Sequence, residues 1–316
     1  MAKHLTTNSL IASVRRRAMI PSNQSTFKEE DFLAFANEEL DMGIVPHILS
    51  YHEDYLLQEA YITMSPSISE YPIPYRATGN KIREVSYVDV SGNIFEMTRI
   101  GVGDLPFYQN GSSGMSNSGI RAFYIEGDEI VILPLGRHAL VGQLKISYYL
   151  RPSLLVSESR VCKITDINTT TGVITVDKVP SNLTTPVEMD FLQTKSPHKR
   201  FVLDITPTAV DVTNKTFTFT PSAIPSTLVV GDQLAASEEC SIPNIPDDLH
   251  SMLAQRVACR CLEALGDQQG LQAANLKLAE MEIKTGQIID NRVEDAPQKI
   301  VNRHGFLRMS RRMLRR

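Results

Sequence analysis

The chain of 316 residues has no tryptophan, only four cysteines and no long uninterrupted apolar run. No two cysteines stand at the CxxC spacing of zinc knuckles and redox motifs, which argues against both kinds of site. We expect Cys162, Cys240, Cys259 and Cys261 to be buried thiols of a protein made in a reducing cytoplasm. The apolar runs are too short for a signal peptide or a membrane-spanning helix, so neither is expected.

Catalytic motifs are missing as well. Residues 114–119 have the GxxxxG outline of a phosphate loop, but Ile120-Arg121 follow where lysine and a hydroxyl residue are required. GxSxG, GxGxxG and HExxH do not occur, and His47 and His52 would be separated by about 140° on a helix. No two carboxylates stand out as an acid–base couple. The sequence therefore predicts no enzyme, no cofactor and no metal site.

The composition is that of a folded, soluble protein. Apolar residues make up 42% of the chain and charged residues 22%, and the length permits one large or two ordinary domains. The net charge of −4 argues against a general nucleic-acid-binding protein, which would be strongly basic.

The first part of the chain is expected to be helical. Thr26 and Glu29 match a capping box, Gly43 is expected to end the helix that follows, and Pro46 suits the first turn of the next. Arg15-Arg16-Arg17 is interpreted as a solvated face. The three predicted helices span 8–20, 26–43 and 45–64.

From Tyr71 the sequence pattern becomes typical of strands and turns. Strands are expected at 81–89, 94–100 and 144–150, and a hairpin with Gly127 at its turn at 123–133. Between them, residues 101–119 are rich in Gly, Ser and Asn, which is typical of a mobile surface loop.

Residues 160–236 contain an internal repeat with offsets between 41 and 45 residues. Two copies are too few for a solenoid, so the two β-rich halves are expected to close on each other as a small barrel or sandwich. The matching segments are Ile164 and Ile205, Ile174-Thr175-Val176 and Phe217-Thr218-Phe219, Val179-Pro180-Ser181 and Ile224-Pro225-Ser226, and Asp190 and Asp232.

After Pro246 the helical pattern returns. Asp247 and Asp248 suit a helix N-terminus, and Gly266-Asp267 should separate this helix from a second one. The second helix carries a heptad-like seam, so the two are expected to form an antiparallel hairpin. The seam residues are Leu271, Ala274, Leu278, Met281, Thr285 and Ile288.

The last 21 residues, 296–316, contain no acidic residue and alternate arginines with apolar side chains. A frayed tail or a purely electrostatic DNA-binding arm would not need the apolar residues, so docking in a protein groove is the favoured interpretation. The predicted docking residues are Phe306, Leu307, Arg308, Met309, Arg311, Arg312, Met313, Leu314, Arg315 and Arg316.

These observations together predict an α+β fold, a helical bundle built from both chain ends with inserted β-rich regions. One of the inserted regions would be the small, internally repeated barrel or sandwich. The expected divisions are 1–65 for the N-terminal helices, 66–154 for a β-rich region, 155–242 for the repeated β-domain, 243–295 for the helical hairpin and 296–316 for the docking arm.

Several stretches stand out by their order along the chain. They are Leu10-Ile11 through Ile20-Pro21, Phe32-Leu33, the Val45-Pro46 helix, Tyr148-Tyr149-Leu150-Arg151-Pro152, the helix 249–265 with Gly266-Asp267, and the basic tail. In this order they resemble the head-to-tail adaptor (connector ring) proteins of short-tailed bacteriophages and their relatives. The resemblance covers the helical flanks and the first β-region, and the repeat at 160–236 resembles insertions seen in some relatives only.

The resemblance implies a structural virion protein at the head–tail junction, synthesised in the host bacterial cytoplasm. Its partners would be the portal protein, tail or tail-hub proteins, and copies of itself in a dodecameric ring. Phage DNA would pass through the ring without sequence recognition, and the C-terminal arm would embrace the portal. The alternatives are a tail-tube or tail-hub component and, less favoured because tryptophan and a carboxylate pair are missing, a carbohydrate-binding tail accessory.

Overall fold

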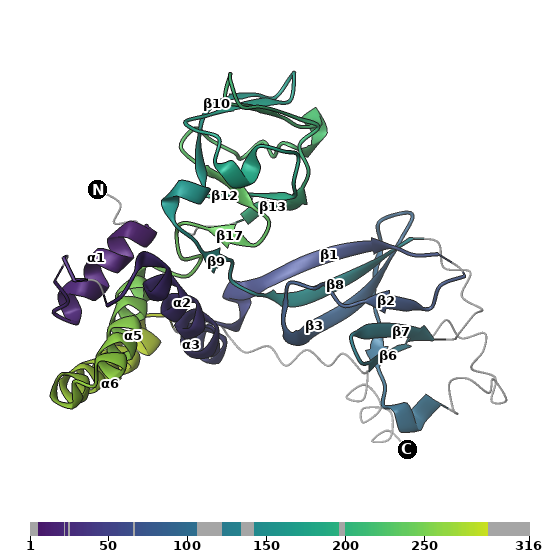
Figure 1. The fold of residues 1–316 in the computed structure, drawn as a ribbon. Coiled ribbons are helices and arrows are strands. Elements are labelled where there is room, and N and C mark those ends of the chain that lie inside the picture. Colours follow the sequence, from purple (N-terminus) through teal and green to yellow (C-terminus); the bar gives the residue numbers. More distant parts are fainter. Residues whose placement is uncertain are drawn as a thin grey trace, which may run out of the picture.

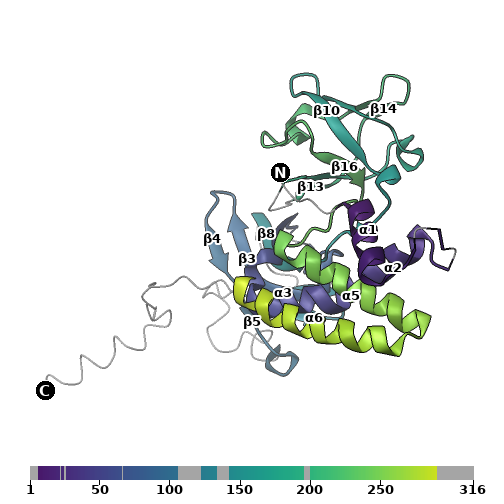
Figure 2. The ribbon, with the colours of Figure 1, turned by 90° about the vertical axis from the view of Figure 1, so that its left-hand side faces the viewer.

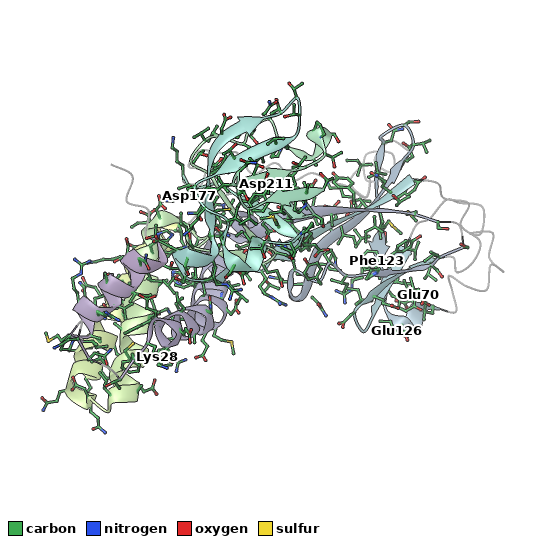
Figure 3. All side chains as sticks on the ribbon, turned by 45° about the horizontal axis from the view of Figure 1, so that its top comes forward. Lys28, Glu70, Phe123, Glu126, Asp177 and Asp211 are labelled. Carbon is green, nitrogen blue, oxygen red and sulfur yellow. The ribbon has the colours of Figure 1, made fainter. Side chains whose placement is uncertain are left out.

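A computed structural model describes residues 6–21, 23–24, 26–65, 67–105, 122–133, 142–195 and 200–289. The helices gather at one end of the molecule (Figure 1), a seven-stranded sheet stands above them, and two four-stranded sheets extend to the other side. Figure 3 marks the three parts with Lys28 at the helices, Asp177 and Asp211 on the seven-stranded sheet, and Phe123 on the four-stranded sheets.

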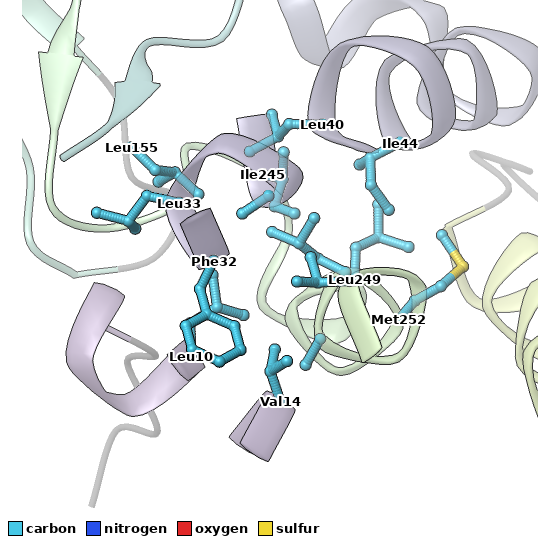
Figure 4. Close-up of a cluster of buried hydrophobic side chains, with 14 of the residues drawn as sticks. Leu10, Val14, Phe32, Leu33, Leu40, Ile44, Leu155, Ile245, Leu249 and Met252 are labelled. Atoms are coloured by element: carbon cyan, nitrogen blue, oxygen red, sulfur yellow. The ribbon is translucent and has the colours of Figure 1, made fainter. Parts of the chain in front are cut away.

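The helices come from both ends of the chain and share one apolar core (Figure 4), in which Leu10, Phe32, Ile44 and Leu249 are all buried. The helical elements are α1 (Thr7–Arg17), α2 (Glu29–Glu39), the π-helix η1 (Leu40–Ile44), α3 (Val45–Tyr51), the 3₁₀ helix η2 (Glu53–Leu56), α5 (Asp247–Leu265) and α6 (Gln268–Ile289). Shorter 3₁₀ turns are η3 (Val102–Asp104), η5 (Glu158–Arg160), η6 (Ser181–Leu183) and η7 (Pro221–Ala223).

Gly43 does not end a helix as the sequence suggested. The π-helix η1 carries the chain from α2 into α3 without a break, and Pro46 lies in the first turn of α3. The wider turn of the π-helix tolerates Pro46, which has no N–H to donate to a regular α-helical hydrogen-bond ladder. A Cβ at Gly43 would lie 2.5 Å from a guanidinium nitrogen of Arg256, so a larger residue here would displace the end of that side chain.

The helix predicted for 45–64 is wrong in its second half. α3 ends at Tyr51, and residues Leu57–Thr63 form strand β1. β1 pairs in antiparallel register with β8, Leu57 opposite Tyr149 and Thr63 opposite Gln143. Side-chain exposure alternates along β1, as in an edge strand with one face covered. Pairing with β8, and not the local sequence, makes this segment a strand.

The two four-stranded sheets pack face to face around a second core. Tyr71 and Ile130 of one sheet meet Val85 and Ile146 of the other in this core. The orders are β1-β8-β3-β4 and β2-β7-β6-β5, and the predicted hairpin is confirmed as β6 and β7 joined at Gly127. The strands are β1, β2 (Glu70–Pro72), β3 (Ala77–Asp89), β4 (Ile94–Glu96), β5 (Thr98–Arg99), β6 (Ala122–Glu126), β7 (Glu129–Leu133) and β8 (Gly142–Leu150).

The repeated segment forms one seven-stranded sheet of order β13-β12-β16-β10-β11-β15-β14 that curves into a half-barrel around a third core. A small parallel pair, β9 (Leu154–Leu155) and β17 (Glu239–Cys240), lies where the chain enters and leaves it. The strands are β10 (Cys162–Asn168), β11 (Val173–Val176), β12 (Met189–Leu192), β13 (Arg200–Ile205), β14 (Ala209–Asp211), β15 (Thr216–Thr218) and β16 (Gln233–Ala236).

The two sequence copies are related by pseudo-two-fold pairing inside this sheet. β12 pairs with its counterpart β16, and β11 pairs with its counterpart β15. The turns match as well, because the Phe219 N–H donates to the Gly172 carbonyl at 2.7 Å and the Val176 N–H donates to the Lys215 carbonyl at 3.0 Å. These two bonds exchange under a shift of 43 residues, so the repeat read from the sequence is present in the structure.

The predicted overall architecture, a helical bundle with β-insertions, is wrong: the described part of the molecule is mostly β, and its strands form four sheets. The helices do not close on themselves as a bundle. Their core includes Leu155, Leu192 of β12 and Ala235 of β16, so they pack against the base of the seven-stranded sheet. Apolar periodicity located the helices correctly at the C-terminal end but gave no information on which surfaces would cover them.

The inner seam of α6 packs on α5. Leu271, Ala274, Leu278 and Met281 contact the shared core and Thr285 is buried, whereas Ile288 is exposed and its neighbour Ile289 is buried instead. Gly266 at φ +73° ends α5 and reverses the chain, as the sequence predicted.

Candidate functional site

The predicted docking residues 306–316 and the GxxxxG segment 114–119 lie outside the described residues. In the part that the structure describes, no group of three or more His, Cys, Asp or Glu side chains could hold a metal ion, and no helix there is long and apolar enough to cross a membrane. All four cysteines are buried free thiols, and burial raises the pKa of Cys162 and Cys261 to about 12. Neither of these two is therefore suited to be a nucleophile.

The most elaborate polar site is a buried arginine between two of the sheets. Arg76, which precedes β3, is only 3% exposed and reaches into the seven-stranded sheet. Its two terminal nitrogens donate to the two carboxylate oxygens of Asp190 at 2.8 and 2.9 Å, a bidentate pair with the fully buried carboxylate. Asp190 also accepts the backbone N–H groups of Asp204 at 3.0 Å and Glu238 at 3.1 Å.

Three more side chains complete this arginine network. Arg76 also donates to Asp204 and, at 2.8 Å, to the Ser237 hydroxyl, while the Tyr75 hydroxyl donates to Asp204 at 2.6 Å. Each polar atom of the guanidinium thus faces an acceptor, which a buried cation requires. We define the network as Tyr75, Arg76, Asp190, Asp204 and Ser237.

The electrostatics keep the network ionised. Burial alone would lower the pKa of Arg76, but the hydrogen bonds that it donates to Asp190 and Tyr75, together with the charge of Asp190, outweigh burial and raise the pKa. Burial would raise the pKa of Asp204, yet hydrogen bonds from Tyr75, Ser237 and Arg76 hold it below its ordinary value. A carboxylate neutralised in this way is a poor general base, so the network is a structural clamp between sheets.

A cavity of about 320 Å³ borders this clamp. It lies between β1 and the start of β3 on one side and Leu203 and Asp204 on the other, so it marks the seam between the sheets. None of its lining residues is a histidine, cysteine or serine. They are Gln58, Glu59, Ala60, Pro74, Tyr75, Arg76, Tyr148, Leu203 and Asp204.

A second polar cluster ties the N-terminal helices to the C-terminal pair. Glu39 at the end of α2 is nearly buried and accepts from Arg256 at 3.1 Å and from Arg260 at 2.6 Å, both on α5. Arg256 also pairs with Glu282 of α6. These pairs link three helices through residues that are up to 243 positions apart in the chain. No local sequence pattern predicts them.

His47 of α3 lies next to this cluster and makes the helical part sensitive to pH. Its Nε2 is 3.4 Å from the Thr285 hydroxyl, and burial lowers its pKa, with Glu282 raising it and Arg256 lowering it. The unfolded state, with a histidine pKa near 6.5, therefore binds the proton more readily than the folded state. Stability at high pH is unaffected by this group and should decline as the pH falls below about 6.5.

We expect His47→Gln to reduce the loss of stability between pH 7.5 and pH 5.5, measured as the urea midpoint at each pH. The comparison with the parent chain removes the contribution of the carboxylates, which titrate in both proteins. An unchanged difference between the two pH values would show that another group governs the acid sensitivity.

An open groove runs along the outer face of α1. Its volume is about 840 Å³, and its wall combines apolar side chains with two arginines and one glutamate. The arginines were expected to be a solvated face, which holds only for Arg16: Arg17 donates to Ser251 and Gln255 of α5, and Arg15 lies over the Phe32 ring. The lining residues are Asn8, Ile11, Ala12, Arg15, Arg16, Met19, Ile20, Pro21 and Glu29.

The face of α6 opposite its inner seam is mainly polar but carries two exposed aliphatic side chains. Leu276 and Ile283 are 76% and 65% exposed, and at about 100° per residue they lie within about 20° of each other on the helix surface. Glu280 and several glutamines share this face. Elsewhere Ile94 and Phe95 are exposed on the edge strand β4.

The described part of the chain thus contains structural clamps and exposed apolar side chains. Its buried polar side chains in the arginine network and at Glu39 are engaged in holding elements together. Compared with known proteins, the chain matches no family model and no curated protein.

Proposed function

We propose that this chain is a structural subunit of a tailed-bacteriophage particle, a head-to-tail adaptor that assembles as a ring between portal and tail. The observation that carries the proposal is the pair of exposed features on the helical part, the α1 groove and the protruding Leu276 and Ile283 of α6. The resemblance in the order of segments to connector-ring proteins supports the same reading. The clamps at Arg76 and Glu39 suit a subunit that must keep its shape under load.

The proposal is tested by the mass of the purified protein with and without a portal ring. Alone, the chain should be largely monomeric, because its surfaces are only partly apolar and copies with a net charge of −4 repel one another. With the portal it should enter a complex of fixed stoichiometry. Closed rings of the isolated chain at micromolar concentration would show that no template is needed, and failure to join the portal would refute the adaptor proposal.

The C-terminal arm supplies a second measurement on the same complex. Deleting 303–316 should leave a folded chain that no longer joins the portal, and Phe306→Ala and Leu314→Ala should each weaken attachment. If the arm instead held DNA by charge alone, its six arginines would give a log-affinity slope against log salt of about −5. Mild salt dependence is the expected result, because partly buried pairs are screened less than exposed ones.

A tail-tube or tail-hub role is the second candidate, and the exposed Ile94 and Phe95 on edge strand β4 favour it. In that role the β-sheets would make the contacts between subunits. Ile94→Lys would then prevent assembly, whereas the adaptor proposal expects the helical surfaces to be decisive.

A further inference from the structure

We propose that the outer face of α6 of one copy docks into the α1 groove of the next copy, so that the subunits join head to tail. This inference rests on the proposed function and adds to it the two surfaces in contact. We call Leu276, Glu280 and Ile283 the α6 ridge, and the groove is the one lined by Ile11, Ala12, Arg15 and their neighbours.

The described part of the chain leaves the ridge exposed. Leu276 is turned about 160° around the helix from Leu278, which packs on the shared core. Leu276 and Ile283 therefore project from the side of α6 that the described core leaves exposed. Covering these two side chains in an assembly would remove apolar surface from water.

The dimensions of the two surfaces match. Leu276 and Ile283 are separated by two helical turns, about 10 Å along the axis. The groove follows α1 from Asn8 to Arg16, about 12 Å, with Met19, Ile20 and Pro21 beyond the helix end. A helix face with two protruding aliphatic side chains fits a groove of this length.

The polar groups also match. Arg15 and Arg16 line the groove, and Glu280, which pairs with Lys277 and Lys284 of its own helix, lies between the two apolar residues of the ridge. Glu29 at the groove would face Lys284 beside the ridge. An apolar centre with paired charges at its rim is the usual composition of a protein–protein interface.

The placement of the two surfaces decides the kind of assembly. Both α1 and α6 pack on α5 (Figure 2), and Gln255 of α5 accepts from Arg17 at 2.8 Å and donates to the Ala274 carbonyl at 3.2 Å. A copy that inserts its ridge into a neighbour's groove thus keeps its own groove free for a third copy. Repetition of one such heterologous contact produces a ring when the rotation closes.

Disulfide trapping tests this pairing directly, because the native cysteines are all buried. Ala12→Cys in the groove and Leu276→Cys on the ridge are made as separate proteins and oxidised alone and as a mixture, at high concentration and again with the portal ring. The mixture should form covalent dimers at least tenfold faster than either protein alone. The double variant should form a ladder of dimers, trimers and larger species.

Ala34→Cys on the exposed side of α2 is the matched control and should give only background cross-linking with Leu276→Cys. Rapid dimers of Leu276→Cys alone would show that two ridges pair symmetrically and would overturn the proposal. So would the absence of mixed dimers in samples whose mass shows complexes, a result that leaves the adaptor function standing. If no complexes form with the portal, the adaptor function itself fails.

A substitution in the ridge gives an independent readout. Ile283→Lys should leave the thermal midpoint unchanged, since the side chain is largely exposed, and should lower the yield of portal-bound rings at least tenfold. Asn275→Lys, exposed on the flank of the same helix, should leave the yield unchanged. Equal yields for the two variants would contradict the docking of the ridge.

Discussion

Replacing Arg76 with methionine is expected to lower the free energy of unfolding by about 3–5 kcal/mol, because it leaves the buried carboxylate of Asp190 without its counter-ion. The methylene stem of methionine keeps most of the packing, so the effect reports the lost charge pair. Two backbone N–H groups would still bond to Asp190, but they do not neutralise its charge. Urea unfolding followed by circular dichroism measures the change.

Two controls separate this effect from a general loss of charge. Arg83→Met removes the ion pair between Arg83 and Asp54, whose side chains are 43% and 55% exposed. This change should lower the free energy of unfolding by no more than about 1 kcal/mol. The double variant Arg76→Met/Asp190→Leu should regain a large part of the stability lost in Arg76→Met, because the fully buried carboxylate is removed together with its counter-ion. The losses in free energy of unfolding of Arg76→Met and of Asp190→Leu are added for comparison. If the double variant loses more than this sum, the network acts through its shape and not through its charges.

Gly172→Ala is expected to destabilise the seven-stranded sheet by on the order of 3 kcal/mol. The residue has φ +74°, and a Cβ added to it would lie 2.0 Å from the Phe219 carbonyl oxygen, which is backbone and cannot rotate away. The change should also weaken the bond from the Phe219 N–H to the Gly172 carbonyl, which links the two sequence copies. Thermal unfolding of the parent and the variant measures the difference.

Gly127→Ala is the matched comparison. Gly127 has φ +59° in the β6–β7 turn, but nothing lies within 4 Å of an added Cβ. It should therefore cost only the backbone strain, about 1 kcal/mol. Equal losses for the two variants would mean that the sheet relaxes around the added methyl group and that only the dihedral angle matters.

The repeat at 160–236 shows how much of the seven-stranded sheet could be predicted from the sequence. Residues 43 positions apart share the same turn and the same backbone bonds, and Asp190 and Asp232 are both buried. The sequence could not tell them apart, although only Asp190 among them pairs with Arg76. The difference arises because one copy faces the four-stranded sheets, and a contact with a residue 114 positions away leaves no periodic signal.

Local physics determined the elements whose signals lie within one turn or one alternation of the chain. The helices α5 and α6 with the glycine between them, the hairpin at Gly127 and the strand β8 follow from spacing, capping and turn chemistry. The same signals predicted a helix for 57–63, which is wrong because pairing with β8 makes this segment a strand.

Tertiary structure alone decided which surfaces are covered. Periodicity identified an inner seam on α6, but whether its outer face meets the core, another helix or solvent depends on packing among segments far apart in the chain. The clamps at Arg76 and Glu39, the groove on α1 and the exposed ridge on α6 all arise in this way. Burial is a property of the packed molecule, so a residue's own neighbours in sequence cannot fix it.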